Sequence, residues 1–377
     1  MGRFFGTDGI RGKFGVEPIT TDFFEKLGYA VASYFHLIHN SKDIKFIIGF
    51  DTRYSGEELS RAFSKGVLRC VGSDIECVGV IPTPALCYLT KEGMFSAGIM
   101  ISASHNPYED NGIKIFNCDG FKLIEEEENL LEKFLSQTCP PRRSATKAGH
   151  PEPQALASPK HREGGKDRYF SFLSTTFPNL SLKNFKIVLD CAHGATFNIA
   201  PKIFKYFGAS VSLIGCSPHG KNINENCGAL HLENLQKEVL NQKAHLGIAF
   251  DGDGDRVMCV DERGEVIDGA DILAIWALFL KQHNQLKNNT VVSTSMCNIG
   301  VEKSLLSQGI RMIRTEVGDR YILEEMRKNN YTLGGEPSGH LIDLDLLPTG
   351  DGILSSLFLC SILQSEGKTL SELSSYS

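Results

Sequence analysis

Short apolar runs alternate with helix-patterned stretches along the chain, and the same order occurs three times. In the first copy, the apolar runs 46–50, 75–80 and 97–101 predict strands, because each is short and rich in β-branched or other apolar residues. Residues 57–68 carry a helical pattern between the first two runs. The third run opens into a polar segment that contains serine, histidine and asparagine.

The second and third copies repeat this order. In the second copy, helical stretches end near Phe207 and cover 232–241, and strands are predicted at 186–190, 209–214 and 246–250. In the third copy, helices are predicted at 301–306 and 321–327, and strands at 291–293, 310–314 and 331–333. Each copy again ends in a polar, glycine-rich segment, at 251–255 and at 334–340.

Three similar α/β units therefore follow one another, and we predict an α/β fold with mixed, mostly parallel sheets covered by helices. Ligands of such sheets bind beyond the carboxyl ends of the strands. Because all three polar segments follow a strand, we expect them to line one shared cleft; the alternative is a chain of unrelated α/β domains. The expected domains are residues 1–138, 166–264 and 265–377.

Residues 139–165 interrupt the repeat. They are rich in Pro, Ala, Arg and Gly and have almost no apolar periodicity. One interpretation is an exposed linker between the first two domains. The other is a stretch that does not belong to the ancestral reading frame, and the sequence leaves both open.

The composition is that of an ordinary globular protein, with 41% hydrophobic and 22% charged residues. The net charge of -6 argues against a nucleic-acid surface, which needs a basic face. The eleven cysteines form no Cys-x-x-Cys pair, as expected for reduced thiols of a cytoplasmic protein. The longest apolar run, 272–280, is far shorter than a membrane helix, and the N-terminus lacks a signal-peptide core. We predict a cytoplasmic protein with no nucleic-acid or membrane partner; an oligomer is neither excluded nor predicted.

Three carboxylates stand within five residues, at Asp251, Asp253 and Asp255. Carboxylates this close repel one another unless a cation neutralises them, and oxygen ligands favour Mg²⁺ or Ca²⁺. An EF-hand loop is a competing interpretation, with Glu262 at its twelfth position, but Arg256 stands at the sixth position, where that loop requires glycine. We therefore predict a Mg²⁺ site, with a solvated acidic turn as the alternative.

Ser104 lies in the segment Ser-Ala-Ser-His-Asn-Pro, directly after a predicted strand. On its own the segment also fits a helix N-cap and a turn, and it is not a Gly-x-Ser-x-Gly hydrolase motif. Beside a Mg²⁺ site, however, a serine hydroxyl is a suitable phosphoryl acceptor. A phosphoserine would bring three oxygens and a charge of about -1.5 to -2 to the metal.

Two further segments offer polar groups to a substrate. Glu336 can accept from two vicinal sugar hydroxyls, Ser338 adds a hydroxyl, and His340 can act as a general acid or base or as a ligand to substrate. Arg11, between glycines, can reach an anion, and Lys114 can take a proton from a hydroxyl or screen a phosphate. The alternatives are a polar turn with a satisfied histidine and two surface cations.

Four stretches together resemble the α-D-phosphohexomutase superfamily. They are Phe-Gly-Thr-Asp-Gly-Ile-Arg-Gly, Ser-Ala-Ser-His-Asn-Pro with Asn-Gly-Ile-Lys, Asp-Gly-Asp-Gly-Asp-Arg, and Gly-Glu-Pro-Ser-Gly-His, in the order and spacing of that family. The resemblance covers residues 1–138 and 166–377. The first and last motifs are most similar to the bacterial phosphoglucosamine mutase branch.

The resemblance implies a role for each polar segment. Ser104 would be the phosphorylated serine, and its phosphate would bind one Mg²⁺ together with Asp251, Asp253 and Asp255. Arg256 would lie near the phosphoserine.

The remaining residues would serve the substrate and its protons. Arg11 would lie beside the phosphoserine as well. Lys114 would be a general base, with His340 as its partner on the other side of the substrate. The sugar would be held by Glu336, Ser338 and His340.

The implied activity is an intramolecular phosphotransfer of the isomerase class, which interconverts glucosamine 6-phosphate and glucosamine 1-phosphate. It would proceed through phosphoserine and a 1,6-bisphosphate intermediate, with glucosamine or glucose 1,6-bisphosphate as activator. The implied partner is a small phosphosugar of amino sugar metabolism. The alternatives are glucose or mannose phosphates as substrates, a metal-dependent phosphatase, or an incomplete chain that binds metal and sugar phosphate without turnover.

The superfamily also has a fourth, C-terminal domain, whose Arg-x-Ser-Gly-Thr-Glu-Pro loop clamps the non-reacting phosphate. This sequence contains no such loop and stops at Ser377, where that domain would begin, so we expect the domain to be absent. The expected consequence is weaker substrate binding, because charge-assisted hydrogen bonds worth about 1.5–3 kcal/mol each would be missing.

Overall fold

The computed structural model describes residues 4–6, 8–137 and 160–375, so most of the predicted linker lies outside the described residues. The chain divides into two compact units. The first unit holds the described residues up to Ile81, together with Leu86–Ala103 and Tyr108–Gly165. The second unit holds Pro82–Ala85, Ser104–Pro107 and the chain from Lys166 onward. The Ser104 segment therefore belongs with the second unit, although the strands on either side of it belong to the first.

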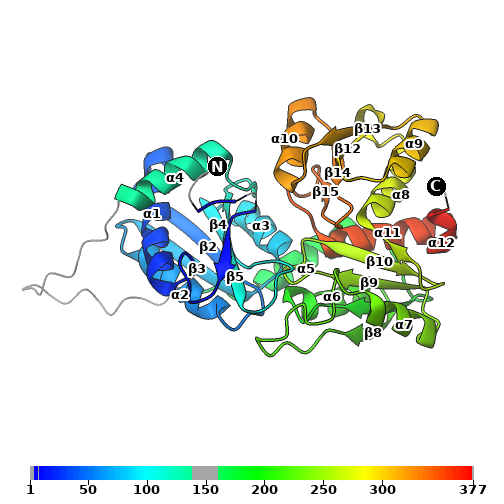
Figure 1. Ribbon diagram of the computed structural model, residues 1–377, viewed down its shortest axis with the longest axis horizontal. Coiled ribbons are helices and arrows are strands. Elements are labelled where there is room, and N and C mark those ends of the chain that lie inside the picture. The colour runs from blue at the N-terminus through cyan, green and yellow to red at the C-terminus, as the bar shows by residue number, and fades with distance from the viewer. Residues whose placement is uncertain (1–3, 7, 138–159, 376–377) are drawn as a thin grey trace, which may run out of the picture. The chain divides into compact units, whose positions relative to one another are not determined.

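The first unit is built on a six-stranded mixed sheet (Figure 1). Its strands, in the order β1-β5-β4-β2-β3-β6, are β1 (Ile10–Lys13), β5 (Asp110–Asn117), β4 (Ala97–Ile101), β2 (Ile44–Phe50), β3 (Ser73–Val80) and β6 (Lys160–His161). The helices are α1 (Thr21–His39), α2 (Gly56–Leu68), α3 (Thr83–Glu92), whose first three residues belong to the second unit, and α4 (Glu125–Gln137). The strands β2, β3, β4 and β6 run parallel, and β1 and β5 are antiparallel to their neighbours. The strand β6 shows that the last part of the predicted 139–165 linker joins the edge of this sheet.

Two glycines explain how closely α1 and α2 pack. A Cβ on Gly66 would lie 2.0 Å from the carbonyl oxygen of Glu25, and a Cβ on Gly28 would lie 2.1 Å from that of Phe63. Only glycine permits this approach of two helix backbones. The α1 helix begins where the Thr20 side chain accepts a hydrogen bond from the Phe23 N–H.

The second unit contains two sheets. The five-stranded sheet has the order β11-β10-β9-β7-β8, with β7 (Lys186–Asp190), β8 (Ser210–Ile214), β9 (Leu246–Phe250), β10 (Val257–Asp261) and β11 (Val266–Ile267). The four-stranded sheet has the order β13-β12-β14-β15, with β12 (Thr290–Thr294), β13 (Arg311–Thr315), β14 (Leu333–Gly335) and β15 (Leu341–Asp343). The helices are α5 (Gly165–Thr176), α6 (Ala200–Tyr206), α7 (Glu233–Gln242), α8 (Gly269–Gln282), α9 (Ile299–Ser307), α10 (Asp319–Asn329), α11 (Gly352–Glu366) and α12 (Leu370–Leu373), with short 3₁₀ turns η1 (Ala195–Phe197) and η2 (Lys287–Asn289).

The predicted α/β class and the mixed, mostly parallel sheets are confirmed. What the sequence did not predict is the direction of the strand that follows each polar segment, nor any strand after the first and third of these segments. These strands return antiparallel to the strand before them, so each polar segment is the connection of a hairpin: β4 to β5, β9 to β10, and β14 to β15. Both ends of each segment are thereby fixed in one sheet.

The helix α11 holds the second unit together, because it is buried on nearly all sides and packs against α8, β9 and β10. Its Phe358 ring stacks on Trp276 of α8 at 4.3 Å between centroids. Asp351 caps its N-terminus by accepting from the Leu354 N–H, and the same carboxylate accepts from the Tyr169 hydroxyl of α5 at 2.7 Å. Burial raises the pKa of Asp351 to about 6.

The raised pKa of Asp351 gives a testable pH dependence of stability. Between its usual value, near 4, and about 6, the folded protein holds a proton on Asp351 that the unfolded chain has released. The free energy of unfolding therefore falls as pH rises through this window, by roughly 3 kcal/mol from this group. Asp351→Asn retains a good N-cap, so its stability relative to wild type should rise from pH 4 to pH 6 and then stay constant.

Urea titrations at pH 4, 5, 6 and 7 measure this difference. Asp167→Asn, at an exposed position on α5, is the matched control and should show a constant difference across the same range. A pH-independent difference for Asp351→Asn would show that Asp351 ionises normally in the folded protein.

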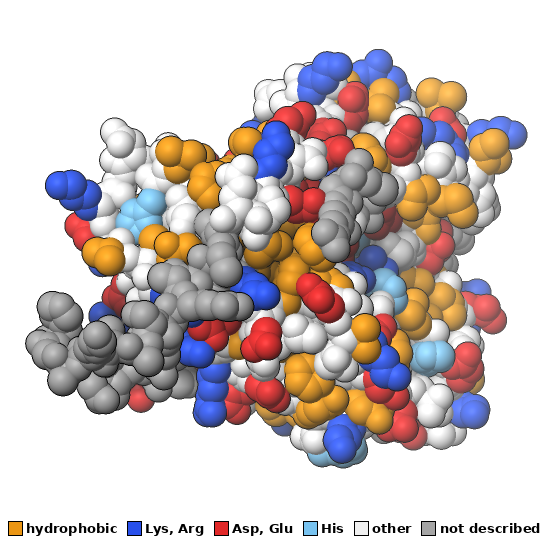
Figure 2. All heavy atoms as spheres, turned by 60° about the vertical axis from the view of Figure 1, so that its left-hand side comes forward, with side chains coloured by type: hydrophobic (Ala, Val, Ile, Leu, Met, Phe, Trp, Pro, Cys, Tyr) orange, Lys and Arg blue, Asp and Glu red, His pale blue; other side chains and the backbone are white. Residues whose placement is uncertain are grey.

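Acidic and basic side chains are interspersed over the face that Figure 2 shows. No helix within the described part of the chain is both long and apolar enough to cross a membrane. The ten cysteines that the structure describes are all free, as the sequence predicts.

Candidate active site

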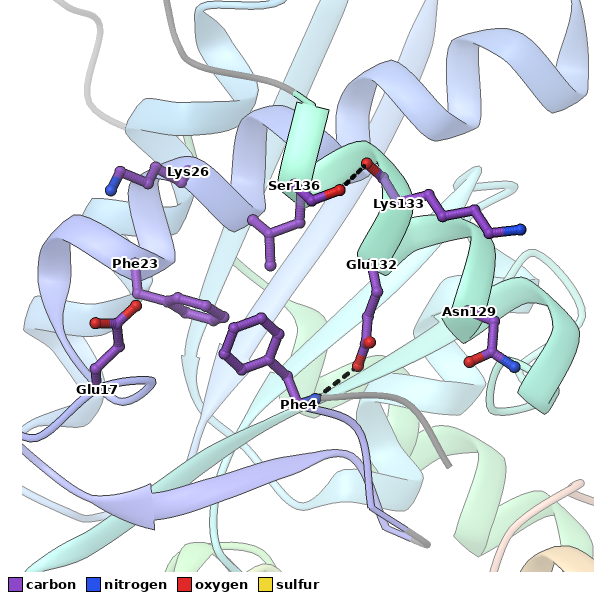
Figure 3. Close-up of a pocket in the computed structure, with 9 residues that line it drawn as sticks. Phe4, Glu17, Phe23, Lys26, Asn129, Glu132, Lys133 and Ser136 are labelled. Atoms are coloured by element: carbon purple, nitrogen blue, oxygen red, sulfur yellow. Dashed lines mark hydrogen bonds between the residues drawn. The ribbon is translucent and has the colours of Figure 1, made fainter.

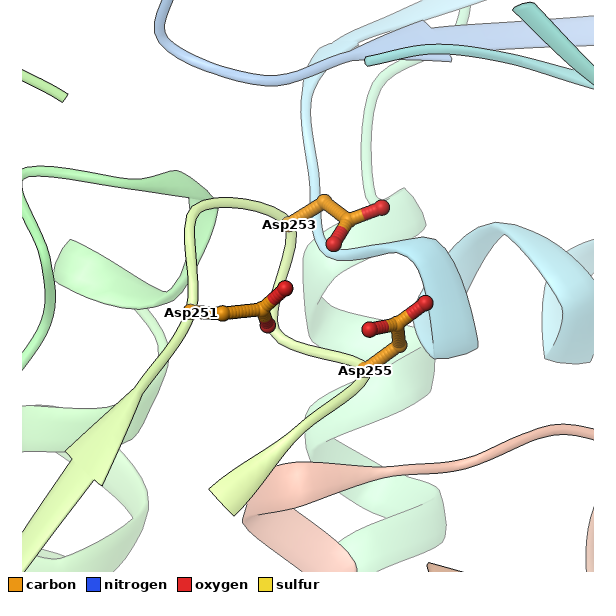
Figure 4. A group of neighbouring side chains, drawn as sticks. All are labelled: Asp251, Asp253 and Asp255. Carbon is orange, nitrogen blue, oxygen red and sulfur yellow. The ribbon is translucent and has the colours of Figure 1, made fainter. Parts of the chain in front are cut away.

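The acidic loop connects β9 to β10, and its three aspartates point toward one another (Figure 4). One carboxylate oxygen from each of Asp251, Asp253 and Asp255 lies within 4.8 Å of the others, and all three residues are buried. Strands flank the loop on both sides, which excludes the helix-flanked EF-hand arrangement.

The electrostatics of this loop favour a bound cation. The pKa of Asp251 is raised well above its usual range, first by burial and then by the negative charges of Asp255 and Asp253. A divalent ion would remove this repulsion, and an all-oxygen set of carboxylates is the donor chemistry that hard cations prefer. The residues present therefore fit a hard divalent metal ion.

The Ser104 side chain is aimed at this acidic loop. Its hydroxyl donates to Asp251 Oδ2 at 2.5 Å and lies 3.3 Å from His105 Nδ1. Ser104 is buried, and its φ of 52° is in the left-handed region that favours glycine. The structure thus brings the predicted phosphorylated serine and the predicted metal ligands together in the second unit.

Hydrogen bonds from Thr83 and from Arg256 hold the acidic loop in place. The Thr83 hydroxyl, at the start of α3, donates to Asp253 Oδ2 at 2.6 Å, and the Thr83 N–H donates to the Asp253 carbonyl. On the other side, the Arg256 N–H donates to Asp251 Oδ1 at 3.2 Å. The Arg256 Nε lies 4.0 Å from Asp255 Oδ1, so this cation borders the carboxylates of the loop.

Gly252 is where the acidic loop touches the Ser104 segment. A Cβ at this position would lie 2.5 Å from the Ser104 carbonyl oxygen, closer than van der Waals contact allows. We predict that Gly252→Ala displaces the Ser104 segment and lowers kcat by about 100-fold, because displacements near 1 Å have this effect on reacting groups. Steady-state kinetics with the phosphosugar that the resemblance implies as substrate measure the loss.

The matched control is Gly300→Ala, in the first turn of α9, where the nearest atom to a new Cβ is a side-chain oxygen at 3.2 Å. It should leave kcat unchanged. Equal rates for Gly252→Ala and wild type would mean that the contact between the two segments does not determine the position of Ser104.

The third segment connects β14 to β15 and is hydrogen-bonded to the base of the acidic loop. The Val257 N–H donates to the Gly339 carbonyl, and a Cβ on Gly339, at φ 90°, would lie 2.1 Å from the Val257 carbonyl oxygen. The Ser338 hydroxyl donates to Glu336 Oε2 at 3.1 Å. The two predicted sugar-binding groups are therefore neighbours on one loop.

His340 is buried on the same loop. Its Nε2 accepts from the Gly350 N–H at 3.0 Å, which leaves the proton of a neutral ring on Nδ1. That Nδ1 lies 3.8 Å from Asp255 Oδ1, and Nε2 lies 3.6 Å from Asp319 Oδ2. His340 thus faces a carboxylate of the acidic loop.

The first unit gathers the two remaining predicted residues around one carboxylate, Asp8. Arg11 lies on β1, opposite Gly112 of β5, rather than in a flexible glycine loop. Its guanidinium forms an ion pair with Asp8, as does Lys122, and the ammonium group of Lys114 lies 3.4 Å from Asp8 Oδ2. Cations of this kind, gathered at one place, are the groups that bind phosphate oxygens in proteins.

The pocket in Figure 3, of about 650 Å³, also belongs to the first unit. It lies between α1 and α4, beside the N-terminal segment, where Glu132 accepts from the Phe4 N–H and the Phe4 ring packs on Phe23 at 5.0 Å between centroids. The residues that line it include none of the predicted site residues. It is a feature of the helix packing and adds nothing to the site.

The sequence interpretation missed several residues near the predicted ones. Among them are Asp8, Thr83 and Asp319, which contact predicted residues, and Lys122, which forms an ion pair with Asp8. Asp8 belongs to the first motif, Phe-Gly-Thr-Asp-Gly-Ile-Arg-Gly, and this membership is the sequence signal that could have identified it. Thr83, Lys122 and Asp319 stand outside the four motifs and are brought in by tertiary structure.

Comparison with known proteins connects this geometry to a family. Models of phosphoglucomutase/phosphomannomutase α/β/α domains I, II and III match residues 2–139, 167–264 and 268–376. The chain belongs to the phosphoglucomutase/phosphomannomutase family. Within it, the chain is 47% identical to the phosphoglucosamine mutase of Myxococcus xanthus and 48% identical to that of Thermoanaerobacter sp.. Each match covers 99% of this chain and 80% or 81% of the relative.

Solved structures of the superfamily share the fold. A putative phosphomannomutase from Thermus thermophilus superposes with a TM-score of 0.84 at 24% identity, covering 98% of this chain and 82% of that one. Aspergillus fumigatus N-acetylphosphoglucosamine mutase, crystallised with GlcNAc-6P and magnesium, superposes with a TM-score of 0.63 at 16% identity, covering 99% of this chain and 79% of that one. At these identities the similarity establishes the fold.

Proposed function

We propose that this chain is a phosphosugar mutase that interconverts glucosamine 6-phosphate and glucosamine 1-phosphate through a phosphoserine at Ser104. The observation that carries the proposal is the Ser104 hydroxyl within hydrogen-bond distance of Asp251, inside a cluster of three buried aspartates. The choice of an amino sugar is supported by relatives of 43–48% identity that are named phosphoglucosamine mutase.

The cation in this proposal is Mg²⁺, held by Asp251, Asp253 and Asp255 together with the phosphoserine. When bound, it would neutralise negative charge on the transferring phosphoryl group. The protein itself keeps the three carboxylates converged, because both ends of their loop are fixed in the β9–β10 hairpin and Thr83 holds Asp253.

The reaction has two phosphoryl transfers. In the first, O1 of the sugar phosphate attacks the phosphorus on Ser104, the bond from phosphorus to Oγ breaks, the O1 proton passes to a base and Oγ takes up a proton from an acid. In the second, after the bisphosphate has turned around, Ser104 Oγ gives its proton to a base and attacks the phosphorus on O6, the bond from phosphorus to O6 breaks, and O6 takes up a proton from an acid. The serine ends phosphorylated again, so the cycle closes; a 1,6-bisphosphate restores any phosphoserine lost to water.

The other residues take the following proposed roles. Lys114 is the base on one side of the sugar. Its Nζ lies 3.4 Å from Asp8 Oδ2 in the resting protein, so an ammonium group there must lose a proton before it can accept the one from the sugar. His340 is the partner on the other side, and Glu336 with Ser338 holds the sugar hydroxyls. Arg11 and Arg256 balance phosphate charge.

A coupled assay tests the proposal. The pure 377-residue chain is given glucosamine 6-phosphate, Mg²⁺ and a trace of the 1,6-bisphosphate, and glucosamine 1-phosphate is measured. Turnover that is faster with this substrate than with glucose or mannose 6-phosphate supports the proposal. Faster turnover of glucose or mannose phosphate would correct the sugar, release of inorganic phosphate would indicate a phosphatase, and no turnover by a chain that carries phosphoserine would indicate binding without catalysis.

A further inference from the structure

The backbone of the Ser104 segment is held by one side chain from another part of the second unit. The Asn224 amide nitrogen donates one hydrogen bond to the Ser104 carbonyl and one to the Asn106 carbonyl, each at 2.9 Å. A side-chain amide has two hydrogens to donate, and here both are used on the segment that carries the reacting serine. These two contacts span the turn on both sides of His105.

Asn224 is itself firmly placed. It lies on the connection between β8 and α7, and its own N–H donates to the Ala192 carbonyl at 2.8 Å. Its φ of 59° is in the left-handed region, which asparagine adopts more readily than most residues other than glycine. Two features therefore favour asparagine at this position: the left-handed backbone conformation and the two N–H groups of the side-chain amide.

Three chain segments meet at the Ser104 carbonyl. The carbonyl oxygen lies against the Asn224 amide, and Gly252 of the acidic loop closes the third side, since a Cβ there would be 2.5 Å from Ser104 O and 2.9 Å from Asn224 Nδ2. Ser104 adopts a φ of 52°, which a serine does not favour without support. The backbone conformation of a residue decides where its Cβ points, and the side chain of Ser104 points at Asp251.

We propose that Asn224 is a positioning residue that keeps Ser104 in its left-handed conformation, and thereby keeps Oγ aimed at the metal-binding carboxylates for phosphoryl transfer. This inference rests on the proposed function, because it assigns Ser104 as the group that accepts and donates the phosphoryl. Asn224 acts through Ser104 and does not itself touch the substrate.

The alternative role for Asn224 is purely structural, in which its amide only satisfies two backbone carbonyls. The two roles predict different kinetics. A structural role lowers the thermal midpoint and leaves kcat of the folded protein unchanged. A positioning role lowers kcat and slows phosphorylation of Ser104, with KM nearly constant, because the substrate's own contacts are intact.

Asn224→Gly removes both donors and keeps the backbone conformation accessible. Asn226→Gly is the matched control, since Asn226 lies on the same connection, also has a positive φ, of 53°, and makes no hydrogen bond to the Ser104 segment among the described contacts. We expect kcat of Asn224→Gly to fall about 10- to 100-fold with KM changed less than about threefold. Phosphorylation of Ser104 by a sugar 1,6-bisphosphate, followed by intact mass, should slow by a similar factor, and Asn226→Gly should match wild type in both measurements.

If Asn224→Gly keeps the wild-type kcat and the wild-type rate of Ser104 phosphorylation, the inference is wrong. Equal losses of kcat in Asn224→Gly and Asn226→Gly would also overturn it, because they would indicate only that the connection between β8 and α7 has loosened. A crystal structure of Asn224→Gly separates this inference from the proposed function. If wild type shows no mutase activity on any phosphosugar, the proposed function fails, and the Ser104 conformation in that crystal still decides the inference. A changed φ at Ser104 supports the positioning role, and an unchanged φ overturns it.

Discussion

Ser104→Ala should reduce mutase turnover to the uncatalysed level. The variant has no oxygen to accept the phosphoryl group, so neither transfer can occur, and the loss should be on the scale of roughly 10⁶-fold that removal of a nucleophile brings. The measurement is the coupled assay for glucosamine 1-phosphate, together with intact mass after incubation with the 1,6-bisphosphate. The mass of the variant should not change, whereas that of wild type should increase by one phosphoryl group.

A nearby serine provides the control. The Ser102 hydroxyl donates to Asp51 at 2.7 Å, so Ser102→Ala also removes a buried hydroxyl that is bonded to a buried aspartate. Ser102→Ala should retain measurable turnover and a phosphorylatable Ser104. Full activity in Ser104→Ala would show that the phosphoserine mechanism is wrong, whatever the fate of the control.

Asp253→Asn should abolish turnover for a different reason. It removes one negative charge and one strong oxygen ligand from the three carboxylates and leaves the Thr83 hydroxyl facing an amide. Loss of groups that merely support a metal ligand costs 10- to 100-fold, so the loss of a ligand should exceed about 100-fold in kcat.

Metal binding can be measured without activity. At a Mg²⁺ concentration of about 100 times its Kd, wild type should gain roughly 2.7 kcal/mol in the free energy of unfolding. Asp253→Asn should gain little at the same concentration, while Asp119→Asn, on an exposed turn, should gain as much as wild type. An unaltered Mg²⁺ response in Asp253→Asn would remove Asp253 from the metal site.

The predicted strands were found where a run of apolar residues is buried on both sides. The strands 97–101, 186–190 and 246–250 were placed within the residues that form β4, β7 and β9, because parallel strands covered by helices are apolar throughout. The strand after the Ser104 segment lacks this signal. β5 begins Asp-Asn-Gly, which is typical of a turn, and carries Lys114 at a buried position, so its pattern does not indicate a strand.

The site was predictable as far as its chemistry is local. Three aspartates spaced by glycines predict a cation site from one stretch of sequence, and the structure brings their carboxylates together. Asn224 has no such signal, because it is 120 residues from Ser104 and its partners are two backbone carbonyls, which every residue has. Contacts of this kind depend on the folded path of the chain and leave no pattern of residue types.

The hairpin that carries the three aspartates also sets how long their loop must be. Phe250 and Val257 lie opposite each other in the ladder, so the loop starts and ends at paired residues. One residue added inside β10 would turn each following side chain to the other face of the sheet and disrupt the packing of the buried strand. A residue added at the loop tip would leave the ladder intact but move the aspartates apart. The length of this loop is therefore constrained as much as its three aspartates are. We expect the loop to tolerate substitutions better than insertions or deletions.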